Sequence, residues 1–316
     1  MERSSLPVAV IGAGPVGLAA AAHLHERGIP FVVFEVGDDI AASVRAWAHV
    51  RLFSPWGFNI DPEARRLLET GGWTAPDPDE HPTGGDLIEQ YLEPLALLPG
   101  ISANLRTKRL VTWVTRLGVD KVRTAGRAQA PFVLATDSPY GFERTLASAV
   151  IDASGTWTQP NPLGADGRPA IGERRANGRI DYGIPDVLGR DRPRYSARRI
   201  AVVGSGHSAQ NLVRDLAALA VRHPCTSVTW VLRRARPGQT LGGGRDDQLP
   251  ERARLGAEAR ALVASRVVAF ETGFHVDELV TADHGVVLLS ADGRKLGPFD
   301  RVVAATGFRP DLGMLG

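Results

Sequence analysis

Residues 6–35 read LPVAVIGAGPVGLAAAAHLHERGIPFVVFE, and this stretch decides the fold. An apolar run ends at Ile11, and a glycine-rich turn follows without a break. An alanine-rich segment of helical character then closes at Gly28, and a second apolar run ends at Glu35. The order predicts strand, glycine turn, helix, strand and acid, which is the opening of a parallel α/β domain.

The glycine spacing in this turn is G-x-G-x-x-G, and each glycine has a physical role in holding a dinucleotide. The first allows a tight turn, the second lets the backbone approach a pyrophosphate, and the third lets the helix pack against the strand. The helix N-terminus offers free N–H groups to the phosphates, and the acid accepts a ribose hydroxyl. The alternative is a tight turn in an ordinary α/β domain. The candidate contacts are Gly12, Ala13, Gly14, Pro15, Val16, Gly17 and Glu35.

The same unit occurs a second time, after the apolar run 200–203. Its turn contains Gly204, Ser205, Gly206, His207, Ser208 and Ala209, with alanine in place of the third glycine. The strand predicted at 227–232 ends in Arg233 and Arg234 instead of an acid. Arginines at this position favour a 2′-phosphate, whereas an acid favours free ribose hydroxyls. We therefore expect FAD on the first turn and NADPH on the second. The alternative for the two arginines is a solvated strand end in an arginine-rich protein.

Composition and charge exclude several other classes of function. The chain has 316 residues and a formal net charge of +2, without a basic stripe, so we expect no nucleic-acid partner. No apolar run approaches the roughly 20 residues of a membrane span, and no leader precedes the first strand, so we expect a cytoplasmic protein. The single cysteine, Cys225, excludes an internal disulfide and a Cys-x-x-Cys pair. The histidines show no metal-ligand spacing.

The segments between and after the two turns predict the domain organisation. Antiparallel strands are expected near 109–114, 121–123 and 131–135, and a buried strand at 149–157. Residues 158–198 are rich in Pro, Gly and Arg and indicate a connector. The predicted fold is α/β, with two Rossmann-like dinucleotide-binding domains and the NADPH domain inserted in the FAD domain. We expect the FAD domain at 1–165, the NADPH domain at 166–297, and a return strand of the FAD domain at 298–316.

The layout resembles the two-dinucleotide-binding flavoprotein superfamily, which includes pyridine nucleotide-disulfide reductases and flavin-containing monooxygenases. Ser154-Gly155-Thr156 and Ala305-Thr306-Gly307 match the turns at which that family crosses between its domains. The resemblance implies cofactor contacts at Thr306 and Gly307. Residues 43–47 resemble a flavin-covering loop, which implies further contacts at Arg45 and Trp47. Trp47 and Trp56 are expected either to wall a pocket or to pack in the core. The loop 241–247 is expected to be a flap near the nicotinamide or a surface loop.

Cysteine chemistry separates the branches of this superfamily. Bacillithiol-disulfide-reductase-like proteins have a cysteine where this chain has Val16, and Cys225 lies far from the first turn in the sequence. The resemblance therefore favours a monooxygenase, which acts through a flavin C4a-hydroperoxide on a small nucleophilic substrate and O2. Two departures keep other functions open. No histidine occurs at 179–185, where monooxygenases have one, and relatives continue beyond the residue that matches Gly316.

Two alternatives therefore remain. The first is an FAD-dependent NADPH reductase or dehydrogenase without oxygen insertion. The second is a non-catalytic nucleotide-binding subunit, with a homo-oligomer or a partner subunit completing the FAD site. In such proteins the cofactor carries out the redox steps, so we expect no acid–base pair and assign no catalytic residue.

Overall fold

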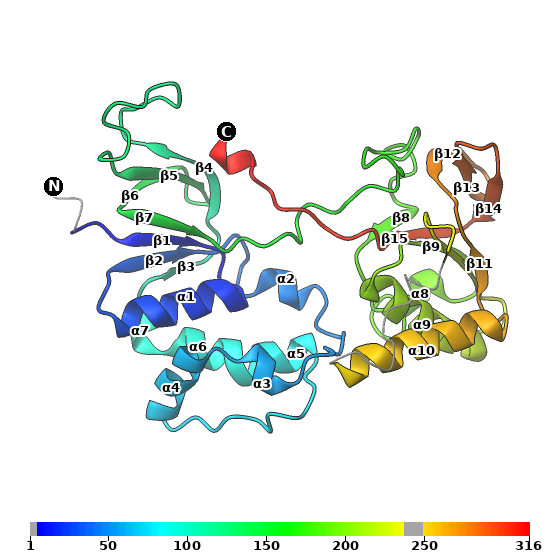
Figure 1. Cartoon of the computed structure of the whole chain (residues 1–316), viewed down its shortest axis with the longest axis horizontal. Coiled ribbons are helices and arrows are strands. Elements are labelled where there is room, and N and C mark those ends of the chain that lie inside the picture. Colours follow the sequence, from blue (N-terminus) through cyan, green and yellow to red (C-terminus); the bar gives the residue numbers. More distant parts are fainter. Residues whose placement is uncertain (1–4, 237–248) are drawn as a thin grey trace. The chain divides into compact units, whose positions relative to one another are not determined.

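The computed structural model describes residues 5–236 and 249–316, and the chain divides into two compact units (Figure 1). The first unit consists of residues up to 158 together with 310–316, and the second runs from 159 to 309. The second unit is thus a continuous insert in the first. The boundaries differ from the expected 165/166 and 297/298, because the segments next to them pair within the second unit. The expected α/β class is confirmed. The loop 241–247 lies outside the described residues.

The first unit is built on a four-stranded parallel sheet with the order β3-β2-β1-β7. Its strands are β1 (Val8–Ile11), β2 (Phe31–Phe34), β3 (Leu105–Arg106) and β7 (Ala149–Asp152). Helix α1 (Pro15–Glu26) connects β1 to β2, as the sequence predicts. A three-stranded antiparallel sheet follows, with β4 (Leu110–Arg116), β5 (Phe132–Asp137) and β6 (Glu143–Ala147) in that order.

Strand β1 is buried on both faces, and its alternate residues pack on different layers. Val8 and Val10 belong to a core formed with the helices. Ala9 and Ile11 belong to a second core, formed with the antiparallel sheet. Side chains alternate between faces along a strand, so a continuous apolar run is what a strand covered on both sides requires. The layers of this unit are therefore helices, parallel sheet and antiparallel sheet.

Two helices of the helical layer begin at side-chain caps. Asp61 caps α4 (Pro62–Thr70) by accepting the N–H groups of Glu63 and Ala64 at 3.0 Å each. Thr83 and Asp86 form a reciprocal capping box at the start of α5 (Gly84–Leu87). The remaining helices are α2 (Ala42–Arg45), α3 (Trp56–Asn59), η2 (Ile88–Leu92), α6 (Glu93–Leu97) and α7 (Pro99–Ser102).

The second unit repeats this plan. Its five-stranded parallel sheet has the order β11-β10-β9-β15-β8, and a three-stranded antiparallel sheet has the order β12-β13-β14. The parallel strands are β8 (Ile180–Tyr182), β9 (Arg199–Val203), β10 (Ser227–Val231), β11 (Ala269–Glu271) and β15 (Arg301–Ala304). The antiparallel strands are β12 (Val276–Ala282), β13 (Gly285–Ser290) and β14 (Lys295–Phe299). The helices are α8 (Arg192–Tyr195), α9 (His207–Arg222) and α10 (Pro250–Ala264), and η4 (Gly313–Leu315) belongs to the first unit.

The central strand β9 is also sandwiched between two layers. Ile200 and Val202 pack with α9 and α10, while Ala201 and Val203 pack with the antiparallel sheet. In both units the glycine turn thus lies at the carboxyl end of a fully buried central strand. This is the edge of an open parallel sheet at which ligands bind.

Three strand predictions differ from the structure. The expected return strand of the first domain is β15, which instead pairs in parallel with β9 and β8 in the second unit. Residues 121–123 form a turn, and β6 supplies the third antiparallel strand. β7 is an edge strand with part-exposed residues rather than a buried one. A short apolar run does not show which sheet a strand joins or whether it lies at an edge, because both depend on the strands with which it pairs.

Within residues 5–236 and 249–316, no helix combines the length and the apolar character needed to cross a membrane.

Candidate functional site

The first glycine turn has the geometry that its spacing predicts. Gly12 has φ +99°, and a Cβ on it would lie 2.5 Å from the carbonyl oxygen of Ala153. A Cβ on Gly17 would lie 1.8 Å from the carbonyl oxygen of Gly12, so α1 packs directly on the turn. No atom lies within 4 Å of a Cβ built on Gly14. Close packing therefore requires glycine at positions 12 and 17, whereas Gly14 has open space beside its backbone.

Glu35 is buried and is bound to this turn. Its Oε2 accepts the N–H of Ala13 at 2.8 Å, and its Oε1 accepts the N–H of Gly37 at 2.9 Å. The exposed fraction of Glu35 is 5%. The two backbone donors compensate the cost of burying the carboxylate and fix its orientation at the end of β2.

A cavity of about 620 Å³ opens over the first turn, within the first unit. Ligand sites commonly have volumes of roughly 300–1,000 Å³. Its wall combines the glycine turn and Glu35 with residues from four other segments. Among these are Trp47, Arg109, Leu110, Ser154, Asp311 and Met314. Pro15 and Val16, at the start of α1, also line it, so the helix N-terminus faces the cavity.

The residues of the expected flavin-covering loop have different positions. Trp47 lines the cavity, with its ring against Gly84, where a Cβ would lie 2.8 Å from the ring. Trp56 is buried in the helical core. Arg45 is not part of the cavity wall, and its expected contact with the cofactor stays a prediction. Its guanidinium instead binds Asp39 at 2.9 Å and Glu93 at 2.8 Å. A nearby acid in the sequence, Asp39, and a distant one, Glu93, thus fix the guanidinium of Arg45.

The second glycine turn repeats the geometry of the first. Gly204 has φ +135°, and a Cβ on it would lie 2.1 Å from the carbonyl oxygen of Ala305. A Cβ on Gly206 would meet no atom within 4 Å. Ala209, in the place of the third glycine, is fully buried in the core beneath α9. The structure therefore accommodates a methyl group at the third position here.

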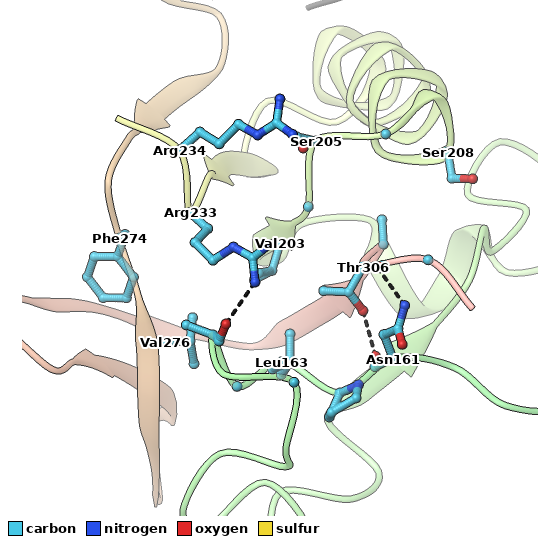
Figure 2. Close-up of a pocket in the computed structure, with 18 of the residues that line it drawn as sticks. Asn161, Leu163, Val203, Ser205, Ser208, Arg233, Arg234, Phe274, Val276 and Thr306 are labelled. Atoms are coloured by element: carbon cyan, nitrogen blue, oxygen red, sulfur yellow. Dashed lines mark hydrogen bonds between the residues drawn. The ribbon is translucent and has the colours of Figure 1, made fainter. Parts of the chain in front are cut away.

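A cavity of about 430 Å³ lies over this second turn, within the second unit (Figure 2). Ser205, Gly206 and Ser208 line it, and His207 does not. Arg233 and Arg234 project from the segment after β10 and also form part of its wall. The described residues that line this cavity include Arg309 as a third arginine, and no acid.

The two arginines after β10 differ in how they are held. Nη1 of Arg233 donates to the carbonyl oxygen of Ala165 at 2.7 Å. A guanidinium has five N–H donors, so within the described residues most of those of Arg233 stay free to bind a ligand. In the described part of the chain, the side chain of Arg234 has no hydrogen-bond partner, and both arginines are exposed. The cavity therefore presents positive charge where the first cavity presents a carboxylate.

The predicted crossing residues Thr306 and Gly307 line the second cavity and are tied to Asn161. Oγ1 of Thr306 donates to the carbonyl oxygen of Asn161 at 2.6 Å, and Nδ2 of Asn161 donates back to that of Thr306 at 3.1 Å. The N–H of Asn161 donates to Gly307 at 2.9 Å, and that of Arg309 donates to Gln159 at 2.9 Å. The two connections therefore run antiparallel as a bonded pair.

Sequence reasoning missed several residues of these walls. Arg109, Asp311 and Met314 line the first cavity, and Asn161 and Arg309 line the second. Asp311 and Arg309 follow the Ala305-Thr306-Gly307 turn directly, so their nearness to that turn was a usable signal. The sequence contains no such signal for Arg109 and Met314, because only tertiary packing brings these two residues to the cavity. Within the described residues, no group of three or more His, Cys, Asp or Glu could hold a metal ion.

Comparison with known proteins agrees with this geometry. The family model for pyridine nucleotide-disulphide oxidoreductases matches residues 9–316 and so includes both glycine turns. The chain belongs to the pyridine nucleotide-disulphide oxidoreductase family. Members of this family are oxidoreductases, so the expected superfamily is confirmed.

The individual relatives of this chain come from more than one branch of the family. It is 26% identical over 245 residues to flavin-containing monooxygenase FMO GS-OX-like 2 from Arabidopsis thaliana, covering 69% of this chain and 48% of the relative. The chain spans about half the length of the curated relatives it matches. Among solved structures, bacillithiol disulfide reductase from Bacillus cereus has a TM-score of 0.70 and 23% identity, over 98% of this chain and 81% of the other.

A flavin-containing monooxygenase from Stenotrophomonas maltophilia is a second structural neighbour of this family member. Its TM-score is 0.60 and its identity 22%, over 100% of this chain and 81% of the other. At these identities the likeness shows the fold alone. The fold is therefore shared by a disulfide reductase and a monooxygenase, and the side chains of the site must distinguish between such functions.

Proposed function

We propose that this protein is an FAD- and NADPH-dependent oxidoreductase, with FAD bound in the first cavity and NADPH in the second. More specifically, we propose that the protein is a monooxygenase, which uses O2 to oxygenate a small nucleophilic substrate. Its partners are then small molecules rather than nucleic acid or membrane, and its location is the cytoplasm. A second subunit or a second copy that completes the flavin site also remains part of the proposal.

One observation carries the assignment of cofactors, and it is the contrast between two otherwise matching turns. The first ends beside the buried carboxylate of Glu35, which suits the free ribose hydroxyls of FAD. The second ends beside the exposed guanidinium groups of Arg233 and Arg234, which suit the 2′-phosphate of NADPH. Exchanging the two cofactors would place the phosphate against a carboxylate and leave the arginines without an anion.

The residues present also fit the two cofactors sterically. Space beside Gly14 and Gly206 lets a pyrophosphate approach the N-termini of α1 and α9, where N–H groups and the helix dipole favour negative charge. Trp47 and Met314 supply apolar surface for a flavin ring. When bound, a flavin accepts hydride from a nicotinamide and can pass the electrons to O2 or to another acceptor.

The position of Val16 favours oxygen chemistry over thiol chemistry. Val16 is 69% exposed and lines the first cavity, so a thiol at this place would face the cofactor. The chain has a single cysteine, Cys225, which is exposed and lies after α9 in the second unit. The first cavity therefore has no thiol of its own to reduce a disulfide.

Two other functions are kept as alternatives. The first is an NADPH-dependent flavin reductase or dehydrogenase without oxygen insertion, which would use the same two cavities. The second is a non-catalytic nucleotide-binding subunit completed by a partner. The relatives named as monooxygenases favour the main proposal over both.

The test is to purify the protein, add FAD, record the flavin spectrum and follow NADPH oxidation with and without O2. We expect bound flavin, faster oxidation of NADPH than of NADH, and O2 consumption. Flavin reduction without O2 consumption would support the reductase instead. A protein that binds no added FAD would refute both enzymatic functions.

A further inference from the structure

Glu173 is a buried acid to which the proposed function assigns no role. It lies in the segment before β8, in the second unit, and is 3% exposed. Three donors converge on its two carboxylate oxygens. The N–H of Leu163 donates to Oε1 at 3.0 Å, and the N–H of Ala170 donates to Oε2 at 2.7 Å. The hydroxyl of Tyr182 donates to Oε1 at 2.6 Å.

These bonds close the loop 163–170 at both of its ends. Within it, the N–H of Gly167 donates to the carbonyl oxygen of Gly164 at 3.0 Å, which forms a turn. The N–H of Ala165 donates to the carbonyl oxygen of Val276 at 2.9 Å, which ties the loop to the start of β12. The carbonyl groups of the loop therefore have fixed positions, because the backbone is held on both sides of them.

Two arginines of the second cavity take their positions from this loop. Arg233 donates to the carbonyl oxygen of Ala165 at 2.7 Å. Nη2 of Arg309 donates to that of Gly167 at 3.2 Å, and its Nε donates to Oδ1 of Asn161 at 2.8 Å. Long arginine side chains lose considerable conformational entropy when they bind a phosphate. Fixing a guanidinium before the ligand arrives reduces that cost.

We propose that Glu173 is a positioning residue, which holds the loop 163–170 so that the Ala165 carbonyl presents Arg233 to the 2′-phosphate of the nicotinamide dinucleotide. This inference rests on the proposed function of the second cavity and deepens it. Glu173 touches no cofactor. It acts through the loop, and its effect is confined to the part of the ligand that Arg233 reaches.

Glutamine is the informative substitution. Glu173→Gln keeps the size of the side chain and one acceptor oxygen, which can still serve Leu163 and Tyr182. Its amide group then places a donor opposite the N–H of Ala170, so the far end of the loop is released. Tyr182→Phe is the matched control, because it removes one donor from Glu173 and leaves both backbone bonds in place. Burial and the bond to Glu173 raise the pKa of Tyr182, so its hydroxyl stays protonated at neutral pH.

The experiment measures binding of 2′,5′-ADP and of 5′-AMP, which lacks only the 2′-phosphate, to the full chain by calorimetry, and so does not depend on flavin chemistry. In the wild type we expect tighter binding of 2′,5′-ADP. We expect Glu173→Gln to weaken the binding of 2′,5′-ADP by roughly tenfold and to leave the binding of 5′-AMP nearly unchanged. Tyr182→Phe should change neither by more than about twofold. In Arg233→Ala, the further change Glu173→Gln should have little additional effect on either ligand.

The outcomes distinguish this inference from the function on which it rests. If the wild type binds both nucleotides equally, the 2′-phosphate role of the cavity is refuted, and this inference with it. In another outcome, the wild type binds the 2′-phosphorylated nucleotide more tightly, while Glu173→Gln weakens the binding of both nucleotides equally. In that case Glu173 has only a structural role. Independent, additive effects of Glu173→Gln and Arg233→Ala would likewise overturn the coupling between them.

Discussion

The carboxylate of Glu35 accepts a hydrogen bond from the backbone N–H of Ala13 at 2.8 Å. This bond joins the end of β2 to the middle of the glycine turn, so the acid and the turn form one preformed site. A second bond, from the N–H of Gly37 to the other carboxylate oxygen, fixes the same side chain from its far side. The proposed ribose acceptor is therefore already oriented before a cofactor binds.

Glu35→Gln should weaken FAD binding by roughly tenfold or more, because a charged acceptor is worth about 1.5–3 kcal/mol and the amide group opposes one of the two N–H donors. Titration of the apoprotein with FAD, followed by quenching of flavin fluorescence, measures this change. Glu89→Gln, at an exposed position, is the control and should bind FAD as the wild type does. Equal affinities of Glu35→Gln and wild type would contradict the role of Glu35.

Gly14→Ala and Gly17→Ala should separate binding from stability. Gly14 has φ −81° and open space beside it, so alanine should leave the thermal midpoint unchanged and reduce FAD affinity. Gly17→Ala pushes a methyl group against the Gly12 carbonyl, and overpacking of this kind costs about 1–3 kcal/mol. Scanning calorimetry and FAD titration of both variants give the comparison. A large loss of stability in Gly14→Ala would show that its space is needed for folding.

Replacing Arg233 and Arg234 together by alanine should raise the KM for NADPH at least about tenfold more than the KM for NADH, since charged hydrogen bonds to phosphate are lost. Steady-state oxidation of both nucleotides by the holoprotein is the measurement. Arg222→Ala, at the exposed end of α9, serves as the control for a lost positive charge. The same increase for both nucleotides would refute a contact to the 2′-phosphate.

Cys225→Ser should leave NADPH oxidation unchanged within about twofold, because exposed surface substitutions have small effects. Cys225 is exposed and lies in the second unit, after α9. Rates are measured for both proteins before and after treatment with a thiol-alkylating reagent. A large decrease in the rate of NADPH oxidation in the serine variant would indicate thiol chemistry and would contradict the proposed monooxygenase.

The Arg199–Asp300 pair should make stability depend on acid pH. The Arg199 guanidinium donates to both oxygens of Asp300, at 3.1 and 2.8 Å, and holds the pKa of that carboxyl below its usual value. A lowered pKa stabilises the folded state above about pH 4, and this contribution is lost as the pH falls through the folded-state pKa. Asp300→Asn should therefore lower Tm by about 2–4 °C at neutral pH, and the difference should shrink toward pH 2. A difference independent of pH would exclude the charge as its cause.

Local sequence signals predicted the turns and several helices well. The glycine spacing and its flanking apolar runs specify a strand, a turn and a helix within a few residues of one another, so no distant contact is needed. Helix α1 (Pro15–Glu26) follows the first glycine turn as the sequence predicts, and Gly12 has φ +99° in that turn. These features depend on propensity, capping and backbone conformation.

Features that depend on distant partners were not predictable in the same way. Arg45 was expected at the flavin, but Glu93 lies within reach only after the helical layer has formed. β15 has the apolar-then-small pattern of β7, and yet it joins the other sheet, because pairing follows the neighbouring strands rather than the pattern. The two compact units divide after residues 158 and 309, which differs from the expected domain limits. The contacts proposed at the cofactors remain predictions.

The paired connections at Gln159–Asn161 and Gly307–Arg309 mean that the second unit starts and ends at adjacent points. A segment whose ends meet can be cut out, or spliced in, without stretching the chain on either side of it. All four strands of the first parallel sheet precede residue 159, so that sheet can assemble during synthesis before any of the insert has emerged. Residues 159–309 thus have the form of a transferable cassette, which a gene fusion could add to an existing nucleotide-binding domain in one event.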